Sequence, residues 1–152
     1  MMGPTKGDLR AFYRRKRDEI SKERRREAED ALMELLWPKL IVYPKVLSFA
    51  PMLGEIDLSR LNEALAAEGR VLFPYLEKGE MKVDGEFNCI LVPGIGFDPF
   101  HHRLGYGKGH FDRFLKHYPK CPTYGIAFRE QRIEDPLPIE SHDVALTHVF
   151  FF

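Results

Sequence analysis

The chain has little cysteine and no surplus of charge of either sign. Only Cys89 and Cys121 occur among 152 residues, which is too few for a disulfide framework, and they lack the paired spacing of metal-binding cysteines. We expect both to be reduced and structural. Lysine and arginine number 23, as do aspartate and glutamate. This balance argues against a nucleic-acid-binding protein, which needs a basic face to neutralise phosphates.

Long apolar runs are also missing. No stretch approaches the roughly 18 apolar residues that a membrane-spanning helix needs, and the chain is charged from Lys6 onward, unlike a signal peptide. We therefore expect a cytoplasmic protein. Internal repeats and low-complexity segments are absent as well. The length and the 44% hydrophobic content suit one domain, residues 1–152, with a core of ordinary size.

Apolar periodicity predicts alternating helices and strands. Spacings of three and four predict helix from residue 5 to about residue 36, divided near Ser21 and ended by Trp37-Pro38. A second helix is predicted at 58–67. Apolar runs predict strands at 46–50, 71–76, 89–92, 124–128 and 144–152. Such alternation is typical of an α/β fold, a three-layer sandwich with a mainly parallel sheet and helices on both faces.

A glycine-punctuated connection follows the apolar run 89–92. Between Gly94 and Gly105 no helix or strand period is visible, and so long a loop in a compact domain is usually functional or disordered. The next residues, 105–109, alternate glycine with Tyr106 and Lys108, and helical spacing begins directly afterwards. Glycine amides and a helix N-terminus at one place favour phosphate binding.

The glycine pattern alone does not specify a function. It is not a Walker A loop, because no Gly-x-x-x-x-Gly-Lys-Ser/Thr pattern occurs. It is not the dinucleotide fingerprint either, because His110 stands where the third glycine of that fingerprint belongs. Arg103 and Lys108 add two cations, which suits the handling of a nucleotide triphosphate. The alternative is a simple helix-capping turn in which Lys108 is solvated, and the glycines leave both open.

Four cations share one face of the first predicted helix. Lys6, Arg10, Arg14 and Arg17 recur at helical spacing. From the helix alone, the favoured interpretation is a solvated basic face, because exposed charge is the default for helical surfaces.

Residues 92–113, VPGIGFDPFHHRLGYGKGHFDR, resemble the central motif of the 5-formyltetrahydrofolate cyclo-ligase family, also called methenyltetrahydrofolate synthetases. Thinner matches occur in the same order along most of the chain. They are KGDLR at 6–10, SFAPMLGEIDLSRL at 48–61, VLFPYL at 71–76, YGIAF at 124–128 and LPIESHD at 137–143.

The resemblance implies a ligase of folate one-carbon metabolism. The expected reaction is the closure of 5-formyltetrahydrofolate to 5,10-methenyltetrahydrofolate, with ATP as co-substrate, Mg²⁺ as cofactor, and ADP and phosphate as products. The implied fold is that of the sugar-phosphate isomerase and CoA transferase group. We expect a monomer that binds neither nucleic acid nor membrane.

The family pattern also implies site residues. Lys108 and Arg103 are the expected catalytic groups. The ATP-binding positions are Lys6, Gly7, Asp8, Leu9, Arg10, Arg103, Leu104, Gly105, Tyr106, Gly107, Lys108, Gly109, His110 and Phe111. The folate-binding positions are Ala50, Glu55, Tyr106, Gly107, Lys108, Gly109 and His110. The expected magnesium ligands are Asp112 and Asp143.

Each acidic position has a structural alternative. Glu55 and Asp112 suit acids that interact with a helix dipole, and Asp143 suits a turn. Zinc is a weaker alternative to magnesium, because the histidines and Cys89 lack the spacing of zinc sites.

Two departures from the family pattern stand out. His110 and Phe111 replace two tyrosines, and the segment after Met81 is shorter than the family's. The shortened segment makes a nucleotide- or folate-binding module with little catalysis conceivable. A nucleic-acid-binding protein that uses the basic residues 6–26 is the less favoured alternative.

Overall fold

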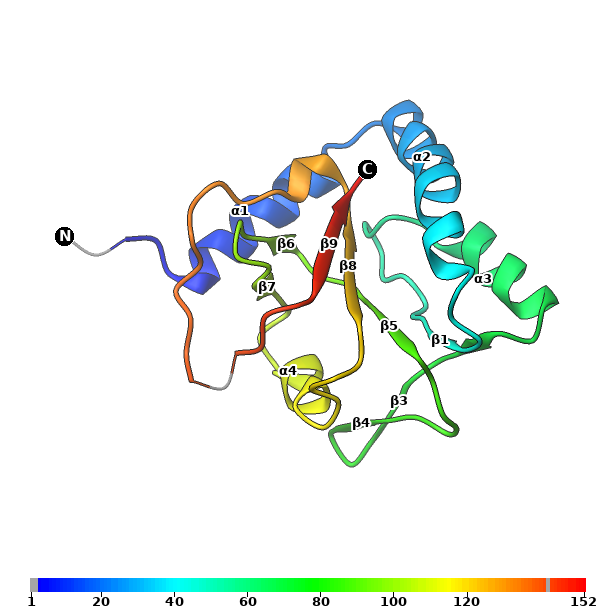
Figure 1. Cartoon of the computed structure of the whole chain (residues 1–152). Helices are drawn as coiled ribbons and strands as arrows, with labels where there is room; N and C mark the ends of the chain where they lie inside the picture. The colour runs from blue at the N-terminus through cyan, green and yellow to red at the C-terminus, as the bar shows by residue number, and fades with distance from the viewer. Residues whose placement is uncertain (1–2, 142) are drawn as a thin grey trace.

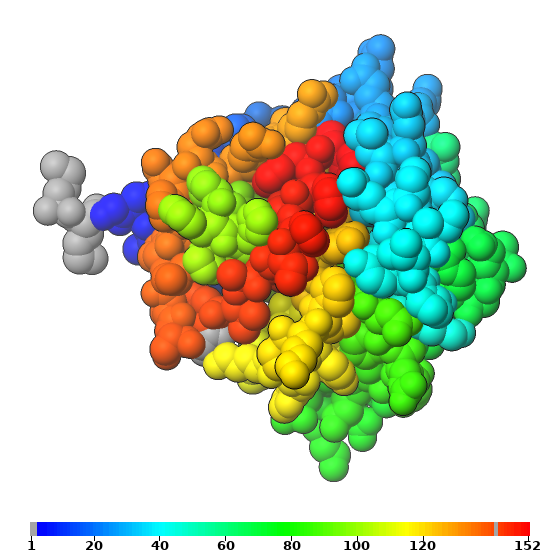
Figure 2. Space-filling view, viewed as in Figure 1, coloured from blue at the N-terminus to red at the C-terminus, as the bar shows by residue number. Residues whose placement is uncertain are grey.

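A five-stranded parallel sheet forms the centre of the protein (Figure 1). The structure is a computed structural model, and it describes residues 3–141 and 143–152. The strand order is β2-β1-β5-β8-β9. The strands are β1 (Val46–Leu47), β2 (Val71–Leu72), β5 (Cys89–Val92), β8 (Thr123–Ala127) and β9 (His148–Phe151). In the space-filling view, the red C-terminal segment lies at the surface between the orange segment before it and cyan α2 (Figure 2).

Alternate residues of these strands face opposite sides, as the period of an extended chain requires. Val46, Leu91 and Ile126 pack with α2 (Lys22–Leu40) and α3 (Ser59–Ala67). Their neighbours in the strands, such as Leu47 and Ile90, pack on the other face with α4 (His110–Leu115). The predicted α/β class, with a parallel sheet and helices on both faces, is confirmed.

Two capped helices begin the chain. Thr5 and Asp8 form a reciprocal capping box at the start of α1 (Lys6–Asp18), and the Ser21 hydroxyl accepts from the Arg24 N–H at the start of α2. The predicted division near Ser21 is therefore confirmed. The predicted end at Trp37-Pro38 is wrong, because α2 includes Pro38 and continues to Leu40. Leu36 and Leu40 are both fully buried one turn apart, and this packing outweighs the hydrogen bond that proline cannot donate.

The predicted strand at 71–76 is two elements. β2 stops at Leu72, and β3 (Tyr75–Glu77) pairs in antiparallel fashion with β4 (Glu80–Lys82) in a separate hairpin. Pro74 lies between them and has no N–H for a ladder, which explains the break. The first strand is likewise shorter than predicted. It ends at Leu47, and the buried Ser48 hydroxyl donates to the Asn62 side chain of α3.

The connection after β5 contains an unpredicted hairpin. β6 (Gly96–Phe97) pairs with β7 (Arg103–Leu104), so the expectation of no strand within residues 94–105 is wrong. Two-residue strands are too short to produce a detectable period. A short 3-10 helix, η1 (Arg129–Gln131), follows β8.

Candidate active site

A cavity of about 1090 Å³ opens at the carboxyl ends of β1, β2 and β5, where α/β proteins usually bind ligands. Its walls come from six parts of the chain. They are the start of α1, the loop after β1, the segment from Phe73 through the β3–β4 hairpin, Pro93 after β5, the segment from Arg103 through α4 to Lys116, and the segment before β9.

Most of the predicted site residues line this cavity. They are Lys6, Arg10, Ala50, Glu55, Arg103, Gly105, Tyr106, Gly107, Lys108, Gly109, His110, Phe111, Asp112 and Asp143. The structure thus brings together residues from both ends of the chain.

Four predicted ATP-binding residues do not line the cavity. Gly7 and Asp8 lie in the exposed first turn of α1, where the Asp8 carboxylate accepts from the Thr5 N–H. Leu9 packs against a buried cluster to which Leu104 belongs. These residues support the positions of Lys6, Arg10 and Arg103, while their own contact with ATP stays a prediction.

Cations outnumber acids in the cavity wall, although the whole chain is neutral. The cations are Lys6, Arg10, Arg103, Lys108, Arg113 and Lys116, and the acids are Glu55, Asp112, Glu140 and Asp143. An excess of positive charge in a cleft with apolar walls raises the local concentration of anionic ligands. The cavity therefore favours a polyanion such as a nucleotide triphosphate.

Arg103 is held against the glycine loop. Its Nε donates to the Pro93 carbonyl, and its guanidinium lies 4.8 Å from the centre of the Phe111 ring. A Cβ at Gly105 would lie 2.5 Å from Arg103 Nη1, so a larger residue at this position would require the guanidinium to move. Burial lowers the pKa of Arg103, and the charge of Asp112 opposes that change. The side chain remains a fixed cation because arginine does not deprotonate in proteins.

The glycine loop is tied to α1. Arg10 Nε donates to the Gly105 carbonyl at 2.8 Å. Gly107 and Gly109 have φ values of 97° and 70°, which other residues rarely adopt. Gly109 caps α4, but α4 has only six residues. The cations therefore provide more of the attraction for phosphate than the helix end does.

Glu55 and Tyr106 form a hydrogen-bonded pair in the same cavity. The Tyr106 hydroxyl donates to Glu55 Oε2 at 3.1 Å, and the Met52 N–H donates to Oε1 at 2.6 Å. Burial raises the pKa of Glu55, whereas the Met52 and Tyr106 bonds and the charges of Arg17 and Arg103 act in the opposite direction. This carboxylate is thus partly desolvated and held in one orientation.

An apolar wall faces the charged part of the cavity. Phe49, Met52, Phe73, Leu76 and Met81 form it. Leu76 and Met81 are cross-strand partners in the β3–β4 hairpin, so residues beside the shortened segment still contribute to the wall. Leu76 nevertheless remains 57% exposed and Met52 58% exposed. The wall is suited to a flat heterocycle but is open on this side.

The predicted magnesium residues meet the chemical requirements of that ion. Asp112 and Asp143 both line the cavity with oxygen donors, and Asp143 bonds the ammonium of Lys6 at 2.7 Å. Magnesium commonly binds one or two carboxylates and completes its shell with phosphate and water. Within residues 3–141 and 143–152, no cluster of three or more His, Cys, Asp or Glu side chains is placed to hold a metal. The donor set therefore fits Mg²⁺ bound together with a phosphate.

The solvated basic face proposed for α1 is wrong for three of its four cations. Lys6 and Arg10 line the cavity, and Arg17 is only 4% exposed. Arg14 is exposed, with its guanidinium 5.1 Å from the centre of the Tyr106 ring. The cations face inward because α1 lies against the glycine loop, which helical periodicity alone does not show.

Two buried polar residues that organise the site were missed. Asp98 accepts from the backbone N–H groups of Phe100, His102 and Leu137, which connects the β6–β7 hairpin to the segment before β9. Gln131 donates to the carbonyls of Gly94 and Ile95. A buried aspartate between two turns gives a weak sequence signal, and a single glutamine gives none.

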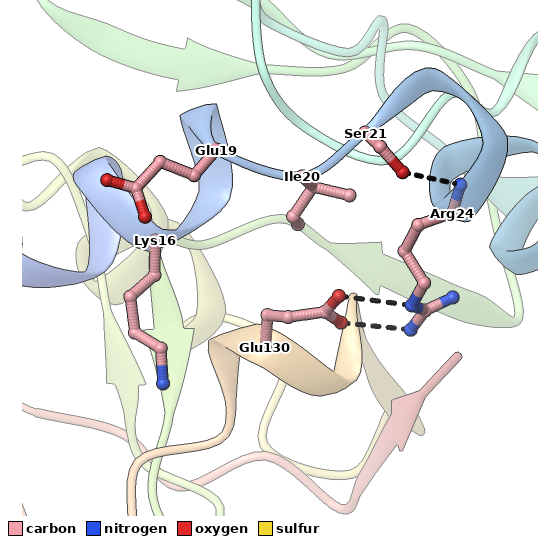
Figure 3. Close-up of a pocket in the computed structure, with 6 residues that line it drawn as sticks. All are labelled: Lys16, Glu19, Ile20, Ser21, Arg24 and Glu130. Atoms are coloured by element: carbon pink, nitrogen blue, oxygen red, sulfur yellow. Dashed lines mark hydrogen bonds and ion pairs between the residues drawn. The ribbon is translucent and has the colours of Figure 1, made fainter.

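A second, shallower hollow of about 390 Å³ lies between the α1–α2 junction and η1 (Figure 3). Arg24 bonds both carboxylate oxygens of Glu130 there, and its Nη2 also donates to the Phe152 carbonyl. The Arg24 guanidinium is thus occupied in joining α2 to the C-terminus. This hollow has the character of a structural junction.

Comparison with known proteins agrees with the arrangement of the main cavity. The model of the 5-formyltetrahydrofolate cyclo-ligase family matches residues 78–151. This range includes the glycine loop, Arg103, Asp112 and Asp143. This range is just under half of the 152-residue chain, and the curated relatives described next carry the same family name. The predicted resemblance to this family is therefore confirmed.

Relatives extend the similarity beyond that range. A probable 5-formyltetrahydrofolate cyclo-ligase of Caenorhabditis elegans is 29% identical over 190 residues, covering 96% of this chain and 92% of the relative. The cyclo-ligase of Mycolicibacterium smegmatis is 42% identical over 65 residues, 43% of this chain and 34% of the relative. The alignment to the nematode protein is longer than this chain, so it contains gaps in this chain.

Two solved structures have the same fold. A 5,10-methenyltetrahydrofolate synthetase from Mycoplasma pneumoniae superposes with a TM-score of 0.84 and 22% identity, covering 95% of this chain and 96% of that one. The synthetase of Aquifex aeolicus gives a TM-score of 0.79 at 29% identity, with coverages of 95% and 88%. Among the residues that the structure describes, no helix is long and apolar enough to cross a membrane.

Proposed function

We propose that this chain catalyses the ATP-dependent closure of 5-formyltetrahydrofolate to 5,10-methenyltetrahydrofolate, with release of ADP and phosphate. One observation carries the proposal. A single cavity in a chain similar to the cyclo-ligase family joins a cation-rich glycine loop to an apolar wall that contains an oriented carboxylate. These two parts match the two substrates, a triphosphate and a folate whose heterocycle is flat.

The triphosphate would lie along the glycine loop. Lys6, Arg10, Arg103 and Lys108 line this part of the cavity, and the glycines at 105, 107 and 109 let the loop amides approach phosphate oxygens. Phosphoryl transfer depends mainly on positioning and on the stabilisation of charge. Fixed cations such as Arg103 provide both without reorganising during the reaction.

The reaction divides into two displacements. The formyl oxygen attacks the γ-phosphorus, an O–P bond forms, and the bond between that phosphorus and ADP breaks. The phosphorylated formyl carbon is then electrophilic, and N10 attacks it to close the ring. The carbon–oxygen bond breaks, phosphate leaves with the electron pair, and N10 loses its proton. Lys108 and Arg103 would stabilise the charge that moves to the phosphate oxygens.

Asp112 and Asp143 would hold Mg²⁺. When bound, the ion neutralises charge on phosphate oxygens. The two aspartates come from α4 and from the segment before β9, so their joint use requires both segments to be in place. His142, which precedes Asp143 in the LPIESHD motif, lies outside the described residues.

Folate would bind across the apolar wall. Tyr106 and the Met52 N–H occupy one acceptor position on each oxygen of Glu55, which leaves further lone pairs for N–H donors of the pterin. His110 and Phe111 stand where the family pattern has tyrosines. Phe111 already contacts Arg103, so this replacement keeps an aromatic face and removes a hydroxyl.

A direct assay tests the proposal. The purified chain is incubated with 5-formyltetrahydrofolate, ATP and Mg²⁺, and the absorbance of the methenyl product is followed, with reactions lacking ATP and a Lys108→Met variant as controls. We expect ATP-dependent product and a stoichiometric release of ADP. Ordinary binding of ATP without any ring closure would instead support the binding module that the open apolar wall makes conceivable. We further propose that the enzyme acts as a cytoplasmic monomer without a nucleic-acid or membrane partner.

A further inference from the structure

Arg17 is a buried cation outside the cavity lining. It is 4% exposed, and its Nη1 donates to the Tyr106 hydroxyl at 2.8 Å. Nη2 donates to the Leu53 carbonyl at 3.3 Å. Its Nε is buried and has no hydrogen-bond partner in the described part of the chain. Burial of a charged group with an unused donor is unfavourable, so the position requires an explanation beyond packing.

The loop that carries Glu55 is closely packed on this guanidinium. Gly54 has a φ of 92°, and a Cβ there would lie 2.8 Å from Arg17 Nε and 3.1 Å from Asp18 Oδ1. Glycine is therefore required for the approach. The contact explains why Nε has no partner, because the Gly54 backbone covers it. Arg17 thus supports the loop on one side and Tyr106 on the other.

The three side chains form a hydrogen-bonded chain with one direction. A guanidinium only donates and an ionised carboxylate only accepts. The Tyr106 hydroxyl accepts from Arg17 and so directs its proton to Glu55 Oε2, 3.1 Å away. Without Arg17 the hydroxyl can rotate, and the carboxylate loses a partner that holds its orientation.

We propose that Arg17 is a positioning residue for folate, which acts by fixing the Tyr106 hydroxyl as a donor to Glu55. The proposal rests on the proposed function, because it assigns Glu55 to the folate. Arg17 does not line the cavity and acts on the site through the Tyr106 hydroxyl. It therefore affects mainly the affinity for folate, because that hydroxyl donates to Glu55 and not to the phosphate-binding groups.

Several charged groups surround this series of hydrogen bonds. Arg17 and Arg103 act on Glu55, the Arg14 guanidinium lies over the Tyr106 ring, and Asp18 lies beside Gly54. Loss of Arg17 removes one of the cations that lower the pKa of Glu55. The acid limb of kcat/KM for folate should consequently move to higher pH in Arg17→Met.

A double-mutant cycle between Arg17→Met and Tyr106→Phe tests the proposal. We expect Arg17→Met to raise the KM for 5-formyltetrahydrofolate about tenfold, the order of one charge-assisted hydrogen bond, with little change in kcat or in the KM for ATP. In the Tyr106→Phe background the same substitution should add little. Effects that multiply, or a loss confined to kcat, would overturn the proposal. Arg17→Lys replaces Arg17→Met in the cycle if the latter does not fold.

Arg25 provides a matched structural control. It donates to the carbonyls of Gly54 and Arg17 but makes no bond to Tyr106. Arg25→Met should lower the Tm. Its effect on the folate KM should be independent of Tyr106→Phe, so the two effects should multiply in the double variant. If Arg25→Met instead coupled to Tyr106→Phe as strongly as Arg17→Met does, loop stability alone would explain the result.

A measurement without turnover separates this proposal from the proposed function. The Cζ shift of Tyr106 is followed by ¹³C NMR in tyrosine-labelled protein and assigned with Tyr106→Phe. Arg17→Met should move this shift and Arg25→Met should not. If the wild-type chain forms no methenyl product, the proposed function fails, whereas an unchanged Tyr106 shift in Arg17→Met overturns the positioning role.

Discussion

The ammonium of Lys6 lies 2.7 Å from Asp143 Oδ2, and this ion pair joins residues 137 positions apart. Lys6 is a predicted ATP-binding residue and Asp143 a predicted magnesium ligand. The pair is partly buried, with side-chain exposures of 22% and 12%, so it is less screened by solvent than a surface pair. It also connects the start of α1 with the segment before β9, which places both groups on one wall of the cavity.

The first prediction concerns the cations of α1. Lys6→Ala and Arg10→Ala should each raise the apparent KM for ATP by about tenfold, the order of one charge-assisted hydrogen bond, and should change the KM for folate far less. Both side chains line the cavity. Arg14→Ala is the matched control, because Arg14 lies on the same helix but does not line the cavity. The measurement is the set of steady-state constants for ATP and folate in the three variants. Equal effects of the three substitutions would show that the helix acts only through its general charge.

The second prediction concerns Lys108. Lys108→Met keeps the loop glycines and removes the charge, so it should lower kcat by roughly 10²-fold or more, the order seen when one stabilising donor is lost. Lys120→Met is the control, because Lys120 is exposed and does not line the cavity. Initial rates at saturating ATP and folate measure the effect. An unchanged kcat with a raised KM for ATP would show that Lys108 contributes to binding alone.

The third prediction concerns magnesium. Asp112→Asn keeps the size of the side chain and removes its charge, so it should abolish most turnover and raise the Mg²⁺ concentration needed for half-maximal rate. Far-ultraviolet circular dichroism should be unchanged, because Asp112 lies in the first turn of the short α4. Full activity of the variant at ordinary Mg²⁺ would contradict the assignment of Asp112 as a ligand.

The local sequence predicts most of the elements and the site positions that a motif encodes. Apolar periodicity was sufficient for α1, α3, β5 and α4, because each has a strongly patterned face or a continuous apolar run. It was not sufficient at Pro38, where the burial of Leu40 overrides a helix-breaking residue, or for β6 and β7, which are too short for a period.

The roles of the α1 cations depend on tertiary contacts that the sequence does not contain. Arg10, Arg14 and Arg17 look alike at helical spacing, yet one lines the cavity, one is exposed and one is buried. The difference arises because residues 54 and 105–107 approach α1 from distant parts of the chain. Similarity to a family supplied Lys6 and Arg10, but no family position indicated Arg17.

The fourth prediction concerns the pH dependence of stability at Glu55. Burial raises the pKa of this carboxyl above its ordinary value, so its protonated form is favoured in the folded state. The corresponding stability is fully present below the unfolded pKa and is lost as the pH rises through the folded pKa. Glu55→Gln has no such loss. Its free energy of unfolding relative to wild type should therefore increase with pH across this window, as measured by urea titration at several pH values. A constant difference would contradict the desolvation of Glu55.

The last prediction concerns the shortened segment after Met81. The phosphate and metal groups come from other parts of the chain, whereas the apolar wall stays open at Leu76 and Met52. A wall interaction that is missing equally from the ground state and the transition state raises KM without lowering kcat. This chain should therefore bind ATP normally, keep its turnover, and need more folate than a family member with the longer segment. Glu55→Gln should raise the folate KM more here than in that relative, because fewer other groups hold the pterin. The test is to measure the steady-state constants of the wild type and of the Glu55→Gln variant, both for this chain and for that relative. A normal folate KM for this chain, together with little effect of Glu55→Gln, would mean that another element completes the wall.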